Sequence, residues 1–361
     1  MKSISTPRFL ILLSLIGYAN LMAQGITTPR TPSPGSTLSQ TIGISTVTVN
    51  YSRPSVKGRE VWGKLVPFGW NKETFGAGNP APWRAGANEN TVITFSHDAT
   101  VQGKTVPAGK YGLFFVINQD NSGEVILSKD YQSWGNFWYD PTHDLLRAPI
   151  QIRDNAHTEL LTYDFINLNK TSGELVLNWE KKQFPVKIEF AVDRIVMANA
   201  TEQLKGTVGF SWQGYNSAAN YALQNKVNLE QALKWADQAI NQNKSFATLN
   251  VKAGLLKEMG KQDESEKLMA DALTIANEAE VNIYGYQLLN QQQFDKAIEV
   301  LASNTKKYPT SANAWDSLGE AYALKGDKTN AIKNFKKSLT LNPAEGVKAN
   351  SEKYLKQFGA L

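Results

Sequence analysis

Hydrophobic and polar residues alternate with a period of two through much of the first half of the chain. Val47, Val49 and Tyr51 fall on one face of an expected strand, with threonine and asparagine on the other, as a half-buried strand requires. The same alternation recurs in residues 91–95, 175–179 and 186–190. Continuous apolar runs at residues 113–117 and 125–127 indicate strands buried on both faces. Turn residues separate these segments, so the pattern predicts an antiparallel β-sandwich or jelly-roll-like domain.

After residue 190 the period becomes helical. We expect a connecting helix over residues 193–205 and a series of helices from residue 213 onward. Eight positions have the spacing of a helix hairpin: Trp315, Leu318, Gly319, Tyr322, Ala331, Phe335, Ser338 and Pro343. This spacing resembles the tetratricopeptide repeat, which is about 34 residues long. One clear copy and two weaker copies precede it, so we expect an α-helical solenoid of four repeats.

Five separated stretches of the first half carry a second resemblance: TLSQTIG (37–43), YSRPSVKGR (51–59), WGKLVP (62–67), WRAGANE (83–89) and PAGKYGL (107–113). In this order they are similar to the family catalogued as domain of unknown function 2911. That family occurs in exported bacterial proteins, chiefly of the Bacteroidetes group, some of which also carry tetratricopeptide repeats. The resemblance covers residues 37–192 and implies no activity or site residue, because the family has no assigned activity.

The chain opens with the features of a secretory signal. Lys2 and Arg8 give a positive start, residues 9–18 are apolar, and Ala23 is a small residue suited to cleavage. Because a spanning helix needs ~20 apolar residues, we expect an exported protein, periplasmic or extracellular and not integral to a membrane, cleaved near Ala23. The patterns thus predict a signal peptide (1–23), a flexible leader (24–36), an all-β domain (37–192), a connecting helix and linker (193–212) and helical repeats (213–361).

The amino-acid composition excludes several kinds of site and partner. The chain has no cysteine, which excludes disulfides, thiolate metal sites and thiol redox chemistry. A formal net charge of +5 is small for 361 residues and is not concentrated in a basic domain, so nucleic acid is not an expected partner. All eight arginines precede residue 200. Since arginine offers a planar fork to carboxylates and phosphates, we expect any anion site in the first half.

No motif predicts a cofactor or a metal ion. Residues 76–81 match the nucleotide-binding pattern G-x-G-x-x-A, but Pro80 and Pro82 oppose the helix that would hold a pyrophosphate. The three histidines lack the paired spacing of zinc ligands, and no G-x-S-x-G turn presents a nucleophilic serine. We therefore expect neither a cofactor nor a metal.

Two segments of the β domain are candidates for a ligand site. Arg84 and Glu89 flank a turn before a strand and His97 follows that strand, which makes these three the catalytic candidates. The alternative is that Arg84 and Glu89 pair with each other and fix the loop. Residues 131–139 hold five aromatic side chains, which either stack on a sugar or peptide or, as we expect, are buried against the sandwich.

Two functions follow from these observations. We favour an exported, non-enzymatic interaction protein whose repeats bind a protein or peptide and whose β domain binds a small ligand or glycan or serves as an anchor. The alternative is an extracytoplasmic hydrolase or isomerase acting on a sugar or peptide through a pocket in the β domain. Because the first helices of stacked hairpins line a continuous groove, their outward positions are the expected contacts for an extended, basic partner segment. These positions are Tyr221, Asn250, Asn282, Tyr286, Asp316 and Glu320.

Overall fold

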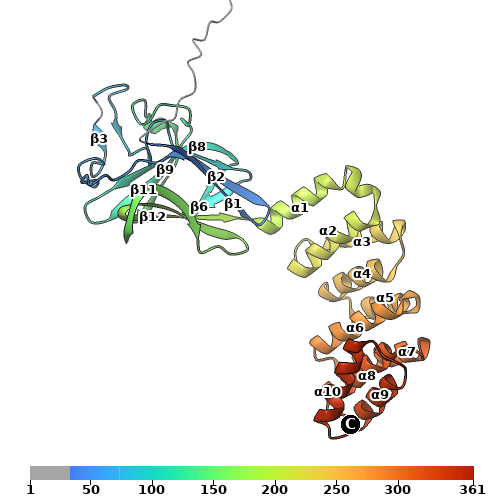
Figure 1. The fold of residues 1–361 in the computed structure, drawn as a ribbon. Helices are drawn as coiled ribbons and strands as arrows, with labels where there is room; N and C mark the ends of the chain where they lie inside the picture. The colour runs from blue at the N-terminus through green and yellow to red at the C-terminus, as the bar shows by residue number, and fades with distance from the viewer. Residues whose placement is uncertain (1–32, 73) are drawn as a thin grey trace, which may run out of the picture. The chain divides into compact units, whose positions relative to one another are not determined.

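The computed structural model describes residues 33–72 and 74–361 and divides the chain into two compact units, one ending at Phe190 and the other beginning at Ala191 (Figure 1). The predicted signal peptide, with its expected cleavage near Ala23, lies outside the described residues. The first strand begins at Gly35, inside the stretch predicted as a flexible leader. In the part of the chain that is described, no helix is both long and apolar enough to cross a membrane.

The first unit consists of antiparallel strands. Its larger sheet has the order β1-β2-β5-β8-β9-β10, formed by β1 (Gly35–Ile42), β2 (Ser45–Ser52), β5 (Val92–Phe95), β8 (Gly109–Ile117), β9 (Ser122–Ser128) and β10 (Asp144–Gln151). A second sheet has the order β11-β12-β6-β7, formed by β11 (Arg153–Ile166), β12 (Ser172–Phe190), β6 (Ala99–Val101) and β7 (Lys104–Val106). The short strands β3 (Asn71–Lys72) and β4 (Pro80–Ala81) pair with each other, and a 3-10 turn spans Pro141–His143.

The core of this unit lies between the two larger sheets. The alternation in β2 sends Val47 and Val49 inward, where both are fully buried. Aromatic rings bridge the sheets: Tyr51 of β2 lies 4.7 Å from Tyr163 of β11, centroid to centroid. Phe115 of β8 likewise lies 5.1 Å from a phenylalanine of β12. The period-two pattern of the sequence therefore records which residues face the opposite sheet.

The second unit is helical throughout. Its helices are α1 (Val192–Gln203), α2 (Trp212–Asn225), α3 (Leu229–Gln242), α4 (Phe246–Glu258), α5 (Gln262–Ile275), α6 (Glu278–Asn290), α7 (Phe294–Lys307), α8 (Ala312–Lys325), α9 (Lys328–Leu339) and α10 (Glu345–Gln357), with a 3-10 turn at Thr207–Phe210. Helices α2 to α9 form four consecutive hairpins, and α10 follows as a single helix (Figure 1). The predicted fold class, an antiparallel β domain followed by a helical-repeat solenoid, is confirmed.

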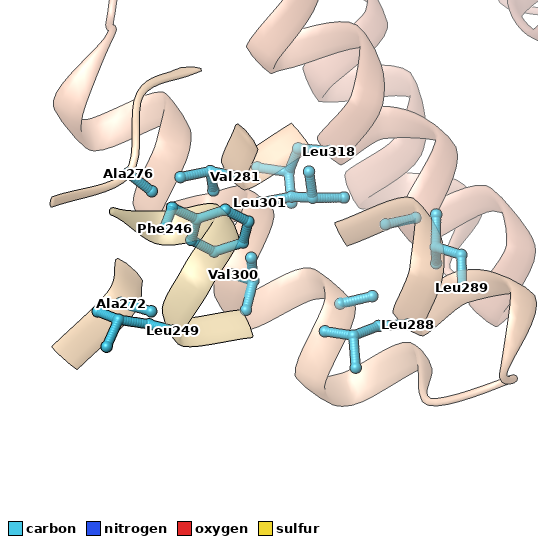
Figure 2. Packing of buried hydrophobic residues seen from close by; sticks show 12 residues of the cluster. Phe246, Leu249, Ala272, Ala276, Val281, Leu288, Leu289, Val300, Leu301 and Leu318 are labelled. Atoms are coloured by element: carbon cyan, nitrogen blue, oxygen red, sulfur yellow. The ribbon is translucent and has the colours of Figure 1, made fainter. Parts of the chain in front are cut away.

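One apolar cluster runs through several hairpins. Figure 2 shows Phe246 of α4 beside Val281 of α6 and Leu301 of α7. Leu249 of α4 and Leu318 of α8 belong to the same cluster. No hairpin buries these side chains by itself, because each apolar face is completed by the next repeat. Stacking of neighbours therefore contributes to the stability of this unit.

The segment predicted as a connector between the domains packs as the first helix of the helical unit. Met197 of α1 and Leu204 after it are buried against Ala218 and Ala222 of α2. At the other end, Tyr354 of α10 stacks on a phenylalanine of α9, with centroids 5.0 Å apart and planes at 10°. Helices outside the four hairpins thus cover both ends of the array.

Candidate functional site

The three catalytic candidates of the β domain do not converge. Arg84 lines a cavity, whereas Glu89 borders a separate hollow beside β1 and β2. His97 lies at the opposite end of β5 from both, where its Nδ1 is 2.9 Å from Ser96 Oγ. Acid–base catalysis requires its groups within reach of one reacting molecule. This set does not form such a site.

The cavity beside Arg84 has a volume of about 510 Å³. Most of its lining comes from three of the five stretches that carry the family resemblance, residues 51–59, 62–67 and 83–89, and the rest includes Trp179 of β12. None of these stretches has a recognisable binding motif by itself, so sequence reasoning does not identify the cavity. The one sequence feature that points to this part of the chain is that all arginines precede residue 200.

The loop that carries Arg84 is held in a fixed conformation. Ala85 has a φ of 55°, in the left-handed region that residues with a side chain rarely adopt. Its carbonyl oxygen accepts hydrogen bonds from the hydroxyls of Thr91, at 3.1 Å, and Tyr163, at 3.0 Å. Just before it, the backbone of Trp83 pairs with that of Phe115 in both directions at 2.9 Å. These contacts maintain a strained backbone, a feature often found at functional sites.

Two indole rings form the apolar part of the cavity wall. Trp83 and Trp179 stack with centroids 5.8 Å apart and planes at 15°. Trp179 is 1% exposed, and its indole N–H is buried without a hydrogen-bond partner. The neighbouring Trp62, by contrast, donates its indole N–H to Glu180 at 3.2 Å. An unpaired buried donor lowers stability, so it is a second unusual feature of this wall.

The remaining motifs of the β domain form no catalytic or metal centre. Residues 76–81, which match a nucleotide-binding pattern, lead into β4, and no helix opens there. Among residues 33–72 and 74–361, no three His, Asp or Glu side chains gather where they could hold a metal ion. The aromatic segment 131–139 is divided: Tyr139 is buried, but Trp134 and Trp138 are 50% and 54% exposed. Our expectation of burial is therefore wrong for these two tryptophans.

In the helical unit, small buried residues set a common register for the first helices of the hairpins. They are Ala219 in α2, Ala253 in α4, Gly285 in α6 and Gly319 in α8. A polar residue lies three positions before each of them: Asn216, Asn250, Asn282 and Asp316. We call Asn216, Asn250 and Asn282 the amide ladder. The carbonyl oxygens of Asn216 and Asn282 are buried and accept no hydrogen bond.

Hydrogen bonds between successive first helices show that these positions share one face. The hydroxyl of Tyr286 in α6 donates to Glu320 of α8 at 2.8 Å. Asn350 of α10 donates to Asp316 of α8 at 2.9 Å, and the hydroxyl of Tyr354 lies 3.3 Å from the Glu320 carboxylate. Side chains one repeat apart are therefore neighbours along this face.

Two predicted partner contacts of α8 are occupied by the protein itself. Asp316 is 4% exposed and also accepts a hydrogen bond from the hydroxyl of Ser351, at 2.5 Å. Its prediction as an outward contact is wrong, because α10 lies over this part of α8. Glu320 is half-buried and is held by Tyr286, Asn350 and Tyr354. The carboxylates that suggested a basic partner are thus bound internally.

Tyr221, the first of the predicted partner contacts along the chain, is also hydrogen-bonded within the protein. The Tyr221 hydroxyl donates to Asp193 of α1 at 2.7 Å. Burial, together with this hydrogen bond, raises the pKa of Tyr221 to about 12. Asn250 is half-buried and borders a hollow of about 500 Å³ between the neighbouring hairpins. The helical face is consequently closed at α8 by α10, and the amide ladder lies on the remaining first helices.

Comparisons with known proteins agree with this division. Residues 33–188 match the family described as Protein of unknown function (DUF2911), and residues 312–345 match the tetratricopeptide repeat. A stretch of 59 residues is 39% identical to Superkiller complex protein 3 of Mus musculus, and of Homo sapiens to the same extent. It covers 16% of this chain and spans only 4% of the length of that relative.

Solved structures of tetratricopeptide-repeat and MamA proteins are similar to a little less than half of the chain. The crystal structure of YrrB, a TPR protein with an unusual peptide-binding site, is 17% identical, covers 44% of this chain and 81% of its own, and has a TM-score of 0.28. MamA (41-end) from Desulfovibrio magneticus RS-1 is 18% identical, covers 43% and 88%, and also has a TM-score of 0.28. Residues 33–188 therefore match the DUF2911 family and residues 312–345 match a tetratricopeptide repeat, a repeat whose stacked copies form the extended surface of a protein-interaction scaffold.

Proposed function

We propose that the protein is exported and uses the amide ladder to hold an extended segment of a polypeptide partner. One observation carries this proposal: the Asn216 and Asn282 carbonyl oxygens are buried on equivalent turns of their helices and have no donor. An unpaired buried acceptor costs roughly 1–3 kcal/mol. A partner that draws these carboxamides outward and supplies N–H groups to their oxygens would recover part of that free energy.

The chemistry of an extended peptide suits such a ladder. Each carboxamide has both donors and an acceptor, so it can pair with a peptide unit in either direction. Packed helices lie roughly 8–10 Å apart, which corresponds to about three residues of extended chain at ~3.3 Å each. Successive ladder positions could therefore contact every third residue or so of one segment.

The contacts of Asp316 and Glu320 remove the reason for expecting a basic partner. Asp316 and Glu320 already accept hydrogen bonds within the protein, so they do not call for a basic ligand. The hollow beside Asn250 is lined by both signs of charge, including Lys257 and Glu258. Recognition through amides depends little on ionic strength, because no exposed ion pair is screened. We therefore propose that backbone groups of the partner, rather than its charges, are recognised.

The test is capture of the partner from the cell envelope by full-length protein. The variant N216A/N250A/N282A should lose most of the captured partner. Its melting temperature should be unchanged or higher, because two of the deleted oxygens are unpaired. The matched control is Q238A/N241A/Q357A, which removes three exposed amides outside the ladder. Intact mass of the chain recovered from the envelope checks export, with an N-terminus expected near Gln24.

Two results would contradict the proposal. Equal capture by the ladder variant and its control would place the binding surface elsewhere. A full-length, uncleaved chain recovered from the cytoplasm would exclude export, whatever the outcome of capture. Addition of about 0.5 M salt should leave capture by the wild type largely intact, since exposed ion pairs are the contacts that salt weakens.

A further inference from the structure

Strand β1 forms an open edge of the larger sheet. It is the outermost strand of the order β1-β2-β5-β8-β9-β10, and all eight of its residues pair with β2 in one unbroken register. The Arg53 backbone N–H donates to the Pro34 carbonyl at 2.9 Å, which shows that the even-numbered residues of β1 bond to β2. The odd-numbered residues therefore direct their N–H and C=O groups away from the sheet.

Four residues of β1 present backbone groups on this edge: Gly35, Thr37, Ser39 and Thr41. In the part of the chain that is described, one hydrogen bond reaches these groups, from the Gln40 side chain to the Thr41 carbonyl at 2.9 Å. A row of backbone donors and acceptors of this kind can pair with a strand that carries matching groups.

The other edges of the two larger sheets are protected. On β10, Pro149 has no N–H, and its carbonyl accepts a hydrogen bond from the Gln102 side chain at 3.1 Å. Strand β7 has only three residues, and its Lys104 ammonium group donates to the Arg147 carbonyl of β10 at 2.5 Å. On β11, the register with β12 shifts, and segment 53–57 forms backbone hydrogen bonds along the edge. Short, charged, proline-containing, bulged or covered edges resist pairing with other chains.

Strand β1 has none of these features. Its sequence GSTLSQTI contains no charged residue and no proline, and its pairing with β2 has no shift. Among the described residues, no further strand lies beyond it in the sheet. A long, regular and uncharged edge strand is a template for pairing with a strand of another molecule.

The strand is complementary to a second copy of itself. When two copies run antiparallel about a two-fold axis between their Leu38 residues, Thr37 lies opposite Ser39 and Gly35 lies opposite Thr41. All four outward residues are then paired, and each pair exchanges two hydrogen bonds. Leu38 is half-buried and shares the core-facing side of β1 with the buried Ile42. It would lie opposite its copy, so both side chains would lose exposed apolar surface.

We propose that the protein forms a dimer in which two copies of β1 pair edge to edge with Leu38 opposite Leu38. Any other antiparallel register leaves at least one outward residue unpaired, so this register is the favoured one. The interface belongs to the β domain and does not depend on peptide binding by the helical unit. One strand pair buries less area than a standard interface of roughly 1,600 Å². The dimer population should therefore rise with protein concentration.

The first test is sedimentation of full-length protein over a range of concentrations. The wild type should approach twice the mass of one chain at the highest concentration. Ser39→Pro removes an outward N–H but keeps the backbone bonds to β2, so it should weaken dimerisation at least about tenfold. Ser39→Ala is the matched control. It removes the same hydroxyl, which lies 3.1 Å from that of Thr48, but it keeps the N–H and should dimerise like the wild type.

The second test uses single cysteines, because the chain has none of its own. In Leu38→Cys the two substituted residues are directly opposite, with Cα atoms about 4.5 Å apart, which a disulfide can span. In Thr41→Cys they are six residues apart along the strands, or about 20 Å, although this position is the more exposed of the two. Mild oxidation should therefore crosslink Leu38→Cys into a covalent dimer and leave Thr41→Cys mostly monomeric.

Three results would overturn the proposal: a wild type that stays monomeric at every concentration, equal dimerisation of Ser39→Pro and Ser39→Ala, or equal crosslinking of the two cysteine variants. If Ser39→Pro fails to fold, the comparison of Leu38→Cys with Thr41→Cys decides alone.

Discussion

Asp316 shows how a neighbouring helix decides the role of a side chain. Its position in α8 is equivalent to that of the ladder asparagines, yet α10 covers it and supplies Ser351 and Asn350 as donors. Burial raises the pKa of its carboxyl above the ordinary 3.8, although these hydrogen bonds act in the opposite direction. The sequence shows the register of this residue but not the helix that lies over it.

A pH-dependent stability follows from that shift. A carboxyl with a raised folded-state pKa binds protons more tightly in the folded state, so its contribution to stability is lost as pH rises from about 3.8 through the folded pKa. Asp316→Asn should therefore gain stability relative to the wild type as pH rises from 3 to 7. Thermal unfolding over this range measures the difference.

Asp327 provides the control of opposite sign. It caps α9 by accepting the Asn330 backbone N–H at 3.0 Å, and hydrogen bonds from Asn330 lower its pKa. Its contribution to stability is present above its unfolded pKa and is lost as pH falls. Asp327→Asn should therefore lose stability relative to the wild type as pH rises. If the stability of both variants changed with pH in the same direction, burial of Asp316 would not be the cause of its pH dependence.

At the scale of elements, the helix hairpins depend on close approach at one position. A Cβ added to Gly319 would lie 2.9 Å from the ring of Phe335, which is itself stacked on Tyr354 of α10. Gly346 in α10 is also helical, but a Cβ there meets nothing within 4 Å. Both glycines are helical, but only Gly346 has free space around its Cα for a side chain.

The expected effects of the two substitutions are opposite. Gly319→Ala should destabilise the protein by about 1–3 kcal/mol, because the ring of Phe335 has no room to move. Gly346→Ala should stabilise it by about 0.5–1 kcal/mol, because alanine favours a helix and restricts the unfolded chain. Urea unfolding of both variants measures the two changes. A similar gain in both would show that the hairpin tolerates a side chain at position 319.

Sequence periodicity predicts the elements better than the sites. The period of two places Val47 and Val49 in the core, and the repeat spacing places Gly319 between two helices. Both patterns depend on the spacing of residues that are close in the sequence, so they can be recognised from the sequence alone. The β-domain cavity, by contrast, combines residues from three stretches and from β12, including Arg84 and Trp179. No local sequence pattern shows that these distant segments line one cavity. For the same reason the sequence does not show that α10 covers Asp316.

At the scale of the whole molecule, the boundary between the units determines which fragments fold. Helix α1 belongs to the helical unit, since Met197 and Leu204 are buried against α2 and Asp193 binds the hydroxyl of Tyr221. A fragment that begins at residue 213 lacks these groups and exposes the apolar face of α2. A fragment of residues 191–361 retains them.

We expect residues 33–190 and residues 191–361 each to fold when expressed alone, because each unit encloses its own apolar core. The shorter fragment 213–361 should be less stable than 191–361 by at least about 3 kcal/mol, since each of two large apolar side chains contributes about 1.5–3 kcal/mol when buried. Urea unfolding followed by circular dichroism compares the two, and a smaller denaturant dependence should accompany the smaller buried surface. Equal stability of the two helical fragments would mean that α1 only joins the units. If neither 33–190 nor 191–361 folded, the two halves would have to be regarded as one cooperative structure.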